Sequence, residues 1–223
     1  MEKQPIYLVQ KLRESIYIDA VWNKSQWQDI KPINLNYSMG DLPAFRPFVQ
    51  AKMMYNDDNI YIIFMVSDRY VRCITKNING PVWEDSAVEF FFAPHPNSSE
   101  TYFNLEVNCG GTPLMHYNRY TRNKYKPIDP EDILEIEIAH SLPKIVDPEI
   151  SESVTWSIEY RIPIEIIKKY SSVTDPKPGS IWKGNFYKCG DKTSNPHFLT
   201  WSFVNHDKPN FHLPQFFGAL QFE

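Results

Sequence analysis

Apolar residues in this chain recur mostly at every second position, the period of a β-strand whose two faces meet different surroundings. Residues 103–108 (FNLEVN) alternate cleanly between apolar and polar side chains. Residues 60–66 (IYIIFMV) are apolar on both faces, which is typical of a central strand covered on both sides. The acidic turn at residues 56–59 predicts that this strand forms a hairpin with residues 48–55.

The same alternation, bounded by turn residues, predicts the other strands. They are residues 6–10, 88–92, 113–120, 134–139, 155–162, 182–188, 198–203 and 217–222. Helical spacing is confined to the stretch that Pro163 opens, with a second helical turn expected near residues 20–27. Strands continue on both sides of the loop-like stretches 121–132 and 174–179, so we expect a single domain over residues 1–223. The pattern predicts an all-β fold: an antiparallel β-sandwich, jelly-roll or immunoglobulin-like, with one or two short helices.

Composition agrees with that class. Aromatic residues make up 15% of the chain, and 18 prolines exceed 8 glycines. The net charge of −4 argues against a nucleic-acid partner, because such a partner needs a basic patch. No apolar run approaches the roughly 20 residues that cross a membrane, so we expect no membrane partner either.

Compartment and oligomeric state stay open. The first ten residues lack the apolar run of a signal peptide. The protein is therefore expected to be either cytoplasmic or a secreted or periplasmic form whose signal has been removed. Cys73, Cys109 and Cys189 are odd in number and widely spaced, without a metal-binding pattern, so they are predicted to be buried free thiols.

The segment 80–92 (GPVWEDSAVEFFF) joins a flat aromatic ring to a carboxylate. Trp83 follows Pro81 in a predicted turn, and Glu89 falls on the strand face opposite Phe90. A sugar ring presents an apolar C–H face and a rim of hydroxyls. An indole for stacking and a carboxylate as acceptor suit that combination. The alternative interpretation is a tryptophan that caps the core beneath a loop.

Other polar side chains share this predicted face. Glu106 and Asn108 fall opposite the apolar side of their strand, and Asn185 and Tyr187 are placed to join them from residues 182–188. Together they would form a polar floor beneath an aromatic clamp. The alternative is an ordinary solvated sheet face. If two such carboxylates are close, they need a proton or a cation between them.

Several motifs occur in an order that resembles family 9 carbohydrate-binding modules over nearly the whole chain. They are IDAVW at residues 18–22, MYNDDNIY at 54–61, WEDSAVEFFF at 83–92, YFNLEVN at 102–108, TWS at 200–202 and FGAL at 217–220. The resemblance implies a sugar-binding β-sandwich of the DOMON-like class. It also implies non-catalytic binding of a mono- or oligosaccharide between two aromatic rings.

The resemblance assigns roles to individual residues. Trp83 matches the first clamp residue, Phe211 matches the second by its position ahead of Pro214, and Glu89 matches a glutamate of the family. Two departures stand out: Phe211 replaces a usual tryptophan, and Glu106 stands where the family carries a basic residue. The predicted ligand-binding set is Trp83, Phe211, Glu89, Glu106, Asn108 and Tyr187.

Two other functions stay open. Glycoside hydrolysis needs two acids that flank the scissile bond, and the acidic cluster supplies candidates in Glu84, Asp85, Glu89 and Glu106. We expect no catalytic residue, because the chain resembles a non-catalytic module from end to end. An interaction domain that kept the sandwich and lost sugar binding is the third interpretation, and the two departures favour it somewhat.

No cofactor is expected beyond structural calcium, which related modules often hold. The oxygen-rich residues 56–59 and 129–132 could supply calcium ligands. The stronger interpretation is that they form turns whose side chains satisfy their own backbone.

Overall fold

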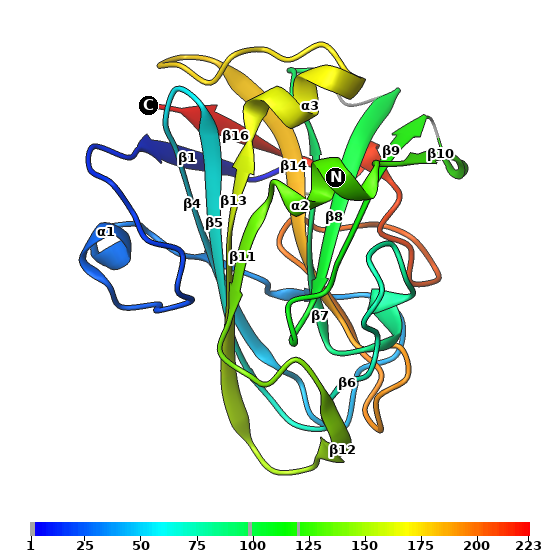
Figure 1. The fold of residues 1–223 in the computed structure, drawn as a ribbon. Helices are drawn as coiled ribbons and strands as arrows, with labels where there is room; N and C mark the ends of the chain where they lie inside the picture. The colour runs from blue at the N-terminus through cyan, green and yellow to red at the C-terminus, as the bar shows by residue number, and fades with distance from the viewer. Residues whose placement is uncertain (1–2, 98–99, 120) are drawn as a thin grey trace.

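Two β-sheet layers face each other in the computed structural model, which describes residues 3–97, 100–119 and 121–223 (Figure 1). Layer A consists, in spatial order, of β10 (Thr121–Pro127), β9 (Pro113–Arg119), β8 (Thr101–Asn108), β7 (Ala87–Ala93), β14 (Ile181–Cys189) and β16 (Gly218–Phe222). Layer B consists of β4 (Phe48–Tyr55), β5 (Asn59–Asp68), β13 (Val154–Pro163) and β11 (Glu137–His140). Three short strands extend the layers: β2 (Ile33–Asn34) beside β4, β15 (Phe198–Thr200) beside β14, and β3 (Tyr37–Ser38) beside β15. Two others, β6 (Val71–Cys73) and β12 (Val146–Ile150), pair with each other in a separate two-stranded sheet.

A single strand, β1 (Ile6–Lys11), joins the two layers. It runs parallel to β16 over residues 6–9 and parallel to β4 over residues 10–11. Every other ladder in the described part of the chain is antiparallel. The predicted all-β sandwich is confirmed, with these two parallel pairings as an addition to it.

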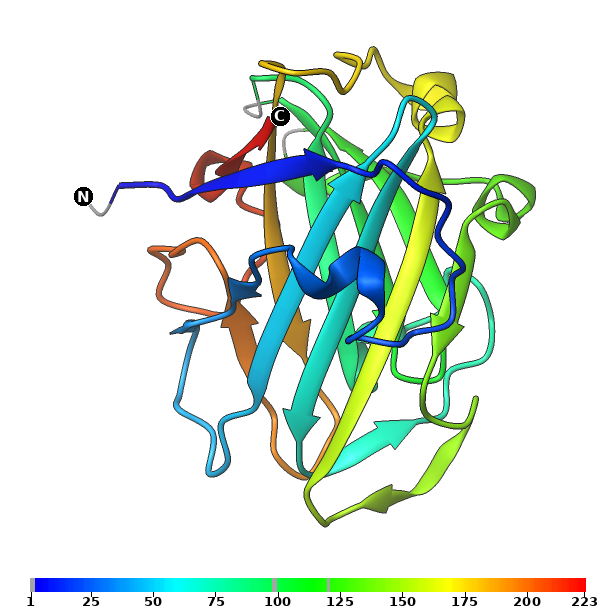
Figure 2. The same cartoon turned by 90° about the vertical axis from the view of Figure 1, so that its left-hand side faces the viewer.

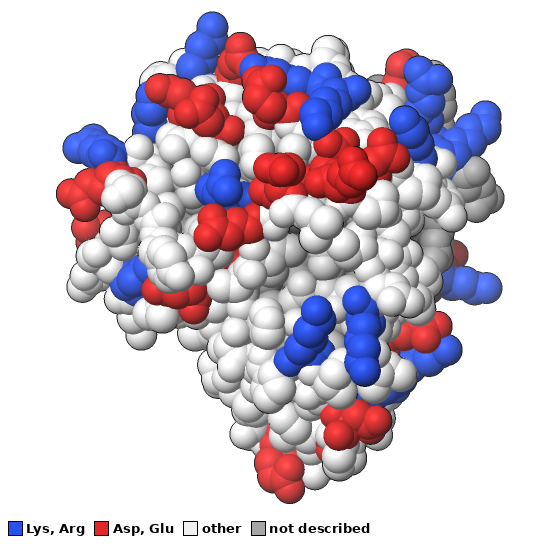
Figure 3. Space-filling model, viewed as in Figure 1, with Lys and Arg blue, Asp and Glu red and all other residues white. Residues whose placement is uncertain are grey.

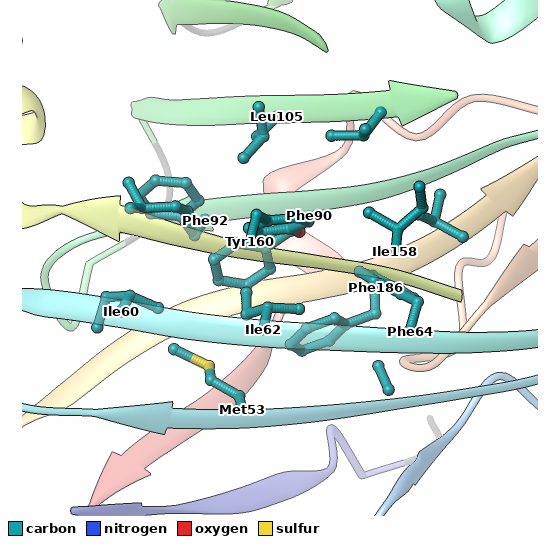
Figure 4. Packing of buried hydrophobic residues seen from close by; sticks show 14 of the residues in the cluster. Met53, Ile60, Ile62, Phe64, Phe90, Phe92, Leu105, Ile158, Tyr160 and Phe186 are labelled. Carbon is teal, nitrogen blue, oxygen red and sulfur yellow. The ribbon is translucent and has the colours of Figure 1, made fainter. Parts of the chain in front are cut away.

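Aromatic side chains from both layers fill the space between the sheets. In layer A, the ring of Phe90 stacks on Phe92 at 4.7 Å between centroids and on Phe186 at 4.8 Å. Phe64 and Tyr160 come from layer B, and Figure 4 shows them in the same packed region. Such pairs contribute about 0.5–1.5 kcal/mol each beyond their buried area. Because Phe90 and Phe92 point into the core, Glu89 and Phe91, which alternate with them along β7, point to the outer face of layer A.

In the described ranges, three short helices and two 3-10 turns complete the fold. They are α1 (Ser25–Gln28), α2 (Pro130–Leu134), α3 (Ile164–Tyr170), η1 (Val82–Glu84) and η2 (Pro214–Phe216). The helices expected near residues 20–27 and after Pro163 correspond to α1 and α3. Strand β10 and the start of helix α2 occupy the stretch 121–132, which the sequence predicted as a loop.

The strand predicted at residues 134–139 was wrong in its first half. Leu134 ends α2 and is 71% exposed, and β11 begins only at Glu137. Pro130 takes the first helical position, where its missing N–H costs nothing. Ile133 and Ile136, three residues apart, are both buried. This spacing favours a helix, and the chain forms a helix up to Leu134 although the same residues also fit an alternating strand pattern.

The outer face of layer B is covered by residues 12–30, which we call the N-terminal strap. Figure 2 shows α1 in front of β4 and β5. Trp27 of the strap is fully buried and packs in a small apolar cluster with Met54 and Ile63 of the sheet. Layer B is therefore closed on both faces.

The surface seen in Figure 3 mixes both signs of charge, and the thiols are buried as the sequence predicted. On the face seen in Figure 3, acidic and basic side chains are interspersed, and Lys and Arg form no continuous patch. Within the described ranges, no helix has the length and apolar character needed to cross a membrane. Cys73, Cys109 and Cys189 are buried and unbridged.

Candidate functional site

A cavity of about 160 Å³ opens on the outer face of layer A. Its floor comes from the residues of adjacent strands that point away from the core. In the β7–β8 ladder, Glu89 lies directly opposite Glu106, and Phe91 lies opposite Asn104. In the β8–β9 ladder, Asn104 lies opposite His116. All five side chains line the cavity, so strand alternation alone brings them to one surface.

Walls rise from the floor on several sides. Trp83 projects from η1, and Tyr125 projects from β10 at the edge of the sheet. The loop at residues 209–212 adds Phe211 and His212. The hydroxyl of Tyr102 lies 2.9 Å from Nδ1 of His212, which ties this loop to the floor.

Trp83 is half-buried and firmly held. The backbone N–H of Asp191 donates to the carbonyl of Trp83 at 3.2 Å, and the N–H of Lys192 donates to that of Glu84 at 3.1 Å. The ammonium of Lys192 also lies 2.8 Å from the Glu84 carboxylate. These bonds fix the backbone that carries the indole, so this turn needs little ordering when a ligand binds.

The floor contains a chain of side-chain hydrogen bonds. The amide Nδ2 of Asn118 donates to Oδ1 of Asn104 at 2.6 Å, and Nδ2 of Asn104 donates to Oε1 of Glu106 at 2.8 Å. On the other side of the floor, the thiol of Cys189 donates to Oε1 of Glu89 at 3.0 Å. These bonds fix the orientation of both carboxylates.

Asn118 leaves one polar atom unused. Its side chain is fully buried, and its Oδ1 has no hydrogen-bond partner among the described residues. A buried acceptor left in this state costs about 1–3 kcal/mol. Because Asn118 lines the cavity, a hydroxyl donor placed there would remove that cost.

Phe211 is the wall residue most engaged with the protein itself. It is 8% exposed, and one face of its ring stacks on Tyr187 at 4.1 Å with 15° between the planes. The ring of Phe91 meets it edge-on at 6.4 Å. The hydroxyl of Tyr187 donates to the backbone carbonyl of Phe211 at 3.2 Å. Burial raises the pKa of Tyr187 well above its usual value, so this hydroxyl stays protonated.

The residues predicted from sequence fall into three groups. Four of them line the cavity together: Trp83, Phe211, Glu89 and Glu106. Tyr187 is fully buried beneath Phe211, outside the lining. Asn108 also lies outside the lining, and its Nδ2 donates to a carboxylate oxygen of Asp85 at 3.0 Å. That carboxylate in turn accepts two backbone N–H groups, from Ile74 and Thr75. Asn108 therefore belongs to a network that shapes the turn before β7.

The lining residues outside the predicted set include four polar or aromatic side chains of the sheet: Asn104, His116, Asn118 and Tyr125. The alternation of the β8 and β9 segments already placed the first three on the polar face, so that signal was available. Tyr125 lay in a stretch predicted as a loop, which concealed its position on an edge strand.

His116 is neutral at ordinary pH. Desolvation lowers the pKa of its imidazole to about 4. Its ring stacks on Tyr125 at 4.4 Å between centroids, with 20° between the planes.

The loops considered for calcium are satisfied by the chain itself. Oδ1 of Asn56 accepts the backbone N–H groups of Asp58 and Asn59, which is a turn-forming arrangement. Asp132 accepts the hydroxyl of Tyr170 at 2.6 Å and pairs with Lys169. In the part of the chain that the structure describes, no three His, Cys, Asp or Glu side chains gather as they would around a metal ion.

Fold and cavity define a class of protein: a β-sandwich that carries an aromatic-walled, polar-floored small-ligand site on one sheet face. The model of carbohydrate-binding family 9 matches residues 16–222, and the chain belongs to that family. No sequence among curated proteins matches it.

Solved structures agree in fold. A candidate carbohydrate-binding protein from Bacteroides uniformis ATCC 8492 is 29% identical, with a TM-score of 0.88 over 99% of this chain and 100% of that chain. A family 9 carbohydrate-binding module from Caldicellulosiruptor kristjanssonii in complex with glucose is 16% identical, with a TM-score of 0.60 over 98% and 96% of the two chains. The same kind of module in complex with cellotriose is 15% identical, with a TM-score of 0.61 over 98% and 94%.

Proposed function

We propose that this protein binds a mono- or oligosaccharide at the cavity on layer A and releases it chemically unchanged. The observation that carries the proposal is the pairing of a half-buried indole, on a hydrogen-bonded turn, with a floor of oriented acceptors. The family supports the same function, and the glucose and cellotriose of the Caldicellulosiruptor complexes supply the first candidate ligands.

In this function, Trp83 stacks against the apolar face of a sugar ring, and Phe211 borders the ring from the loop. Glu89, Glu106 and Asn118 accept hydrogen bonds from its hydroxyls. Stacking supplies most of the free energy and the acceptors supply selectivity. We expect dissociation constants from micromolar to millimolar, because the contact area is small and the hydroxyls must shed water.

The carboxylate geometry favours binding over hydrolysis. Glycosidases place two acids on either side of the scissile bond. Here Glu89 and Glu106 are cross-strand neighbours on a single sheet face, so both approach a ligand from the same side. This arrangement suits two acceptors beneath one sugar better than an acid and a nucleophile that flank a bond.

Isothermal titration calorimetry with glucose, cellobiose and cellotriose tests the proposal. We expect saturable binding that Trp83→Ala abolishes without unfolding the domain. Trp22→Ala is the matched control, because Trp22 is also partly buried but lies against the strap cluster on layer B. The absence of binding to all three sugars at high millimolar concentration would contradict the proposal and favour the interaction-domain interpretation.

A further inference from the structure

We propose that Tyr125, supported by His116, is a sugar-contacting aromatic wall that holds the second ring of an oligosaccharide at the β10 edge of the cavity. The inference rests on the proposed function, because it assigns a further residue to the same site. It adds a stacking surface that neither the motifs nor the expected two-residue clamp included.

Tyr125 offers a ligand a more open aromatic ring than Phe211 does. Both Phe211 and Tyr125 line the cavity, but their rings differ in what they can offer a ligand. Phe211 is 8% exposed, and one of its faces is covered by Tyr187. Tyr125 is 52% exposed. Stacking on a sugar needs an open ring face, and Tyr125 has far more of it.

His116 on the neighbouring strand supports the ring of Tyr125. The β9–β10 register pairs Tyr125 with Asn118 and Pro127 with His116. His116 is therefore the diagonal neighbour of Tyr125, within reach of an aromatic side chain. The imidazole covers one face of the phenol ring at 4.4 Å and leaves the other face for a ligand. Since His116 is uncharged near neutral pH, this support needs no counter-ion.

The cavity lining extends across five neighbouring strands of layer A. The cavity lining runs from Cys189 on β14 to Tyr125 on β10. Four strand spacings separate these two strands in the order β14–β7–β8–β9–β10, or about 19 Å at ~4.8 Å per spacing. One sugar ring cannot bridge that span. A ring stacked near Trp83 therefore leaves the Tyr125 end for the next unit of a chain.

Affinity for glucose and for cellotriose, measured by calorimetry, tests the assignment. Tyr125→Ala should weaken cellotriose binding ~10-fold, the equivalent of losing one aromatic contact, and glucose binding less than ~3-fold. Tyr125→Phe keeps the ring and should retain both affinities. Tyr17→Ala is the matched control, because Tyr17 is an exposed tyrosine outside the cavity. Thermal melting verifies that each variant is folded.

The outcomes separate this inference from the proposed function. If Tyr125→Ala keeps its cellotriose affinity while Trp83→Ala loses it, the Tyr125 assignment is overturned and sugar binding stands. If Tyr125→Ala loses as much affinity for glucose as for cellotriose, the second-ring assignment is overturned. It is also overturned if Tyr125→Phe loses as much cellotriose affinity as Tyr125→Ala does. A wild-type protein that binds neither sugar removes both proposals together.

Discussion

On the outer face of each sheet layer, a carboxylate lies near an indole from a flanking segment, but the two faces differ in what covers them. On layer B, Nε1 of Trp27 donates to Oε1 of Glu159 at 2.8 Å. On layer A, Trp83 stands beside Glu89 and Glu106 at the edge of a cavity. An indole beside a carboxylate on a sheet face is therefore a closed structural feature in one place and an open site in the other.

On layer B, the chain supplies its own hydrogen-bond donors. Oε2 of Glu159 accepts the backbone N–H groups of Asp19 and Ala20 at 3.0 and 2.8 Å, and the ammonium of Lys24 at 2.7 Å. Glu159 is fully buried. The N-terminal strap thus occupies for layer B the place that we propose a sugar occupies on layer A. Residue types alone do not distinguish the two cases, because the difference lies in which segment crosses the face.

The largest expected effect is on the closed face. Glu159→Ala should lower the free energy of unfolding by about 3–5 kcal/mol, because it leaves a partly buried ammonium and several N–H donors unsatisfied. Urea denaturation followed by tryptophan fluorescence measures this. The control is Glu137→Ala, which breaks the exposed pair with Arg161 and should cost less than about 1 kcal/mol. If both variants lower the free energy of unfolding by the same amount, Glu159 does not anchor the N-terminal strap to layer B.

The two tryptophans give the next contrast. Trp27→Ala should destabilise the fold by about 3–5 kcal/mol, since Trp27 is fully buried. Trp83→Ala should cost about 1 kcal/mol or less, because Trp83 is only partly buried. Sugar affinity should respond in the opposite order. A Trp83 variant as unstable as the Trp27 variant would mean that Trp83 is a core residue.

Two asparagines on the outer face of layer A test where the binding site ends, because Asn118 lines the cavity and Asn108 does not. Asn118→Ala should weaken sugar binding ~5-fold, about one hydrogen bond, through loss of the acceptor Oδ1. Asn108→Ala should leave affinity unchanged and lower stability by about 1–2 kcal/mol, because it removes a donor to buried Asp85. Calorimetry and urea denaturation of both variants measure the two quantities. Loss of affinity in the Asn108 variant would return that residue to the binding set.

These contrasts show what the sequence could and could not predict. Alternation in the β7 and β8 segments correctly placed Glu89 and Glu106 on one polar face, because side-chain direction in a strand is a local property. It could not separate Asn108 from them. Alternation tells which face of the sheet a residue lies on, but not whether its position along the strand falls inside the cavity. It also could not show that Tyr187 lies beneath Phe211, which depends on the path of the loop at residues 209–212.

The smallest expected effect concerns pH and the one imidazole on the floor of the open face. The pKa of His116 is about 4 in the folded protein, against 6.5 in an unfolded chain. Between these values the unfolded chain binds the extra proton, so the free energy of unfolding falls as the pH drops from 6.5 towards 4. Solvent reaches part of this ring, so we expect about 1 kcal/mol. In His116→Gln this part of the pH dependence should vanish. In His206→Gln, a change at an exposed histidine, this pH dependence should persist. If the free energy of unfolding varies with pH in the same way in both variants, His116 does not cause the effect.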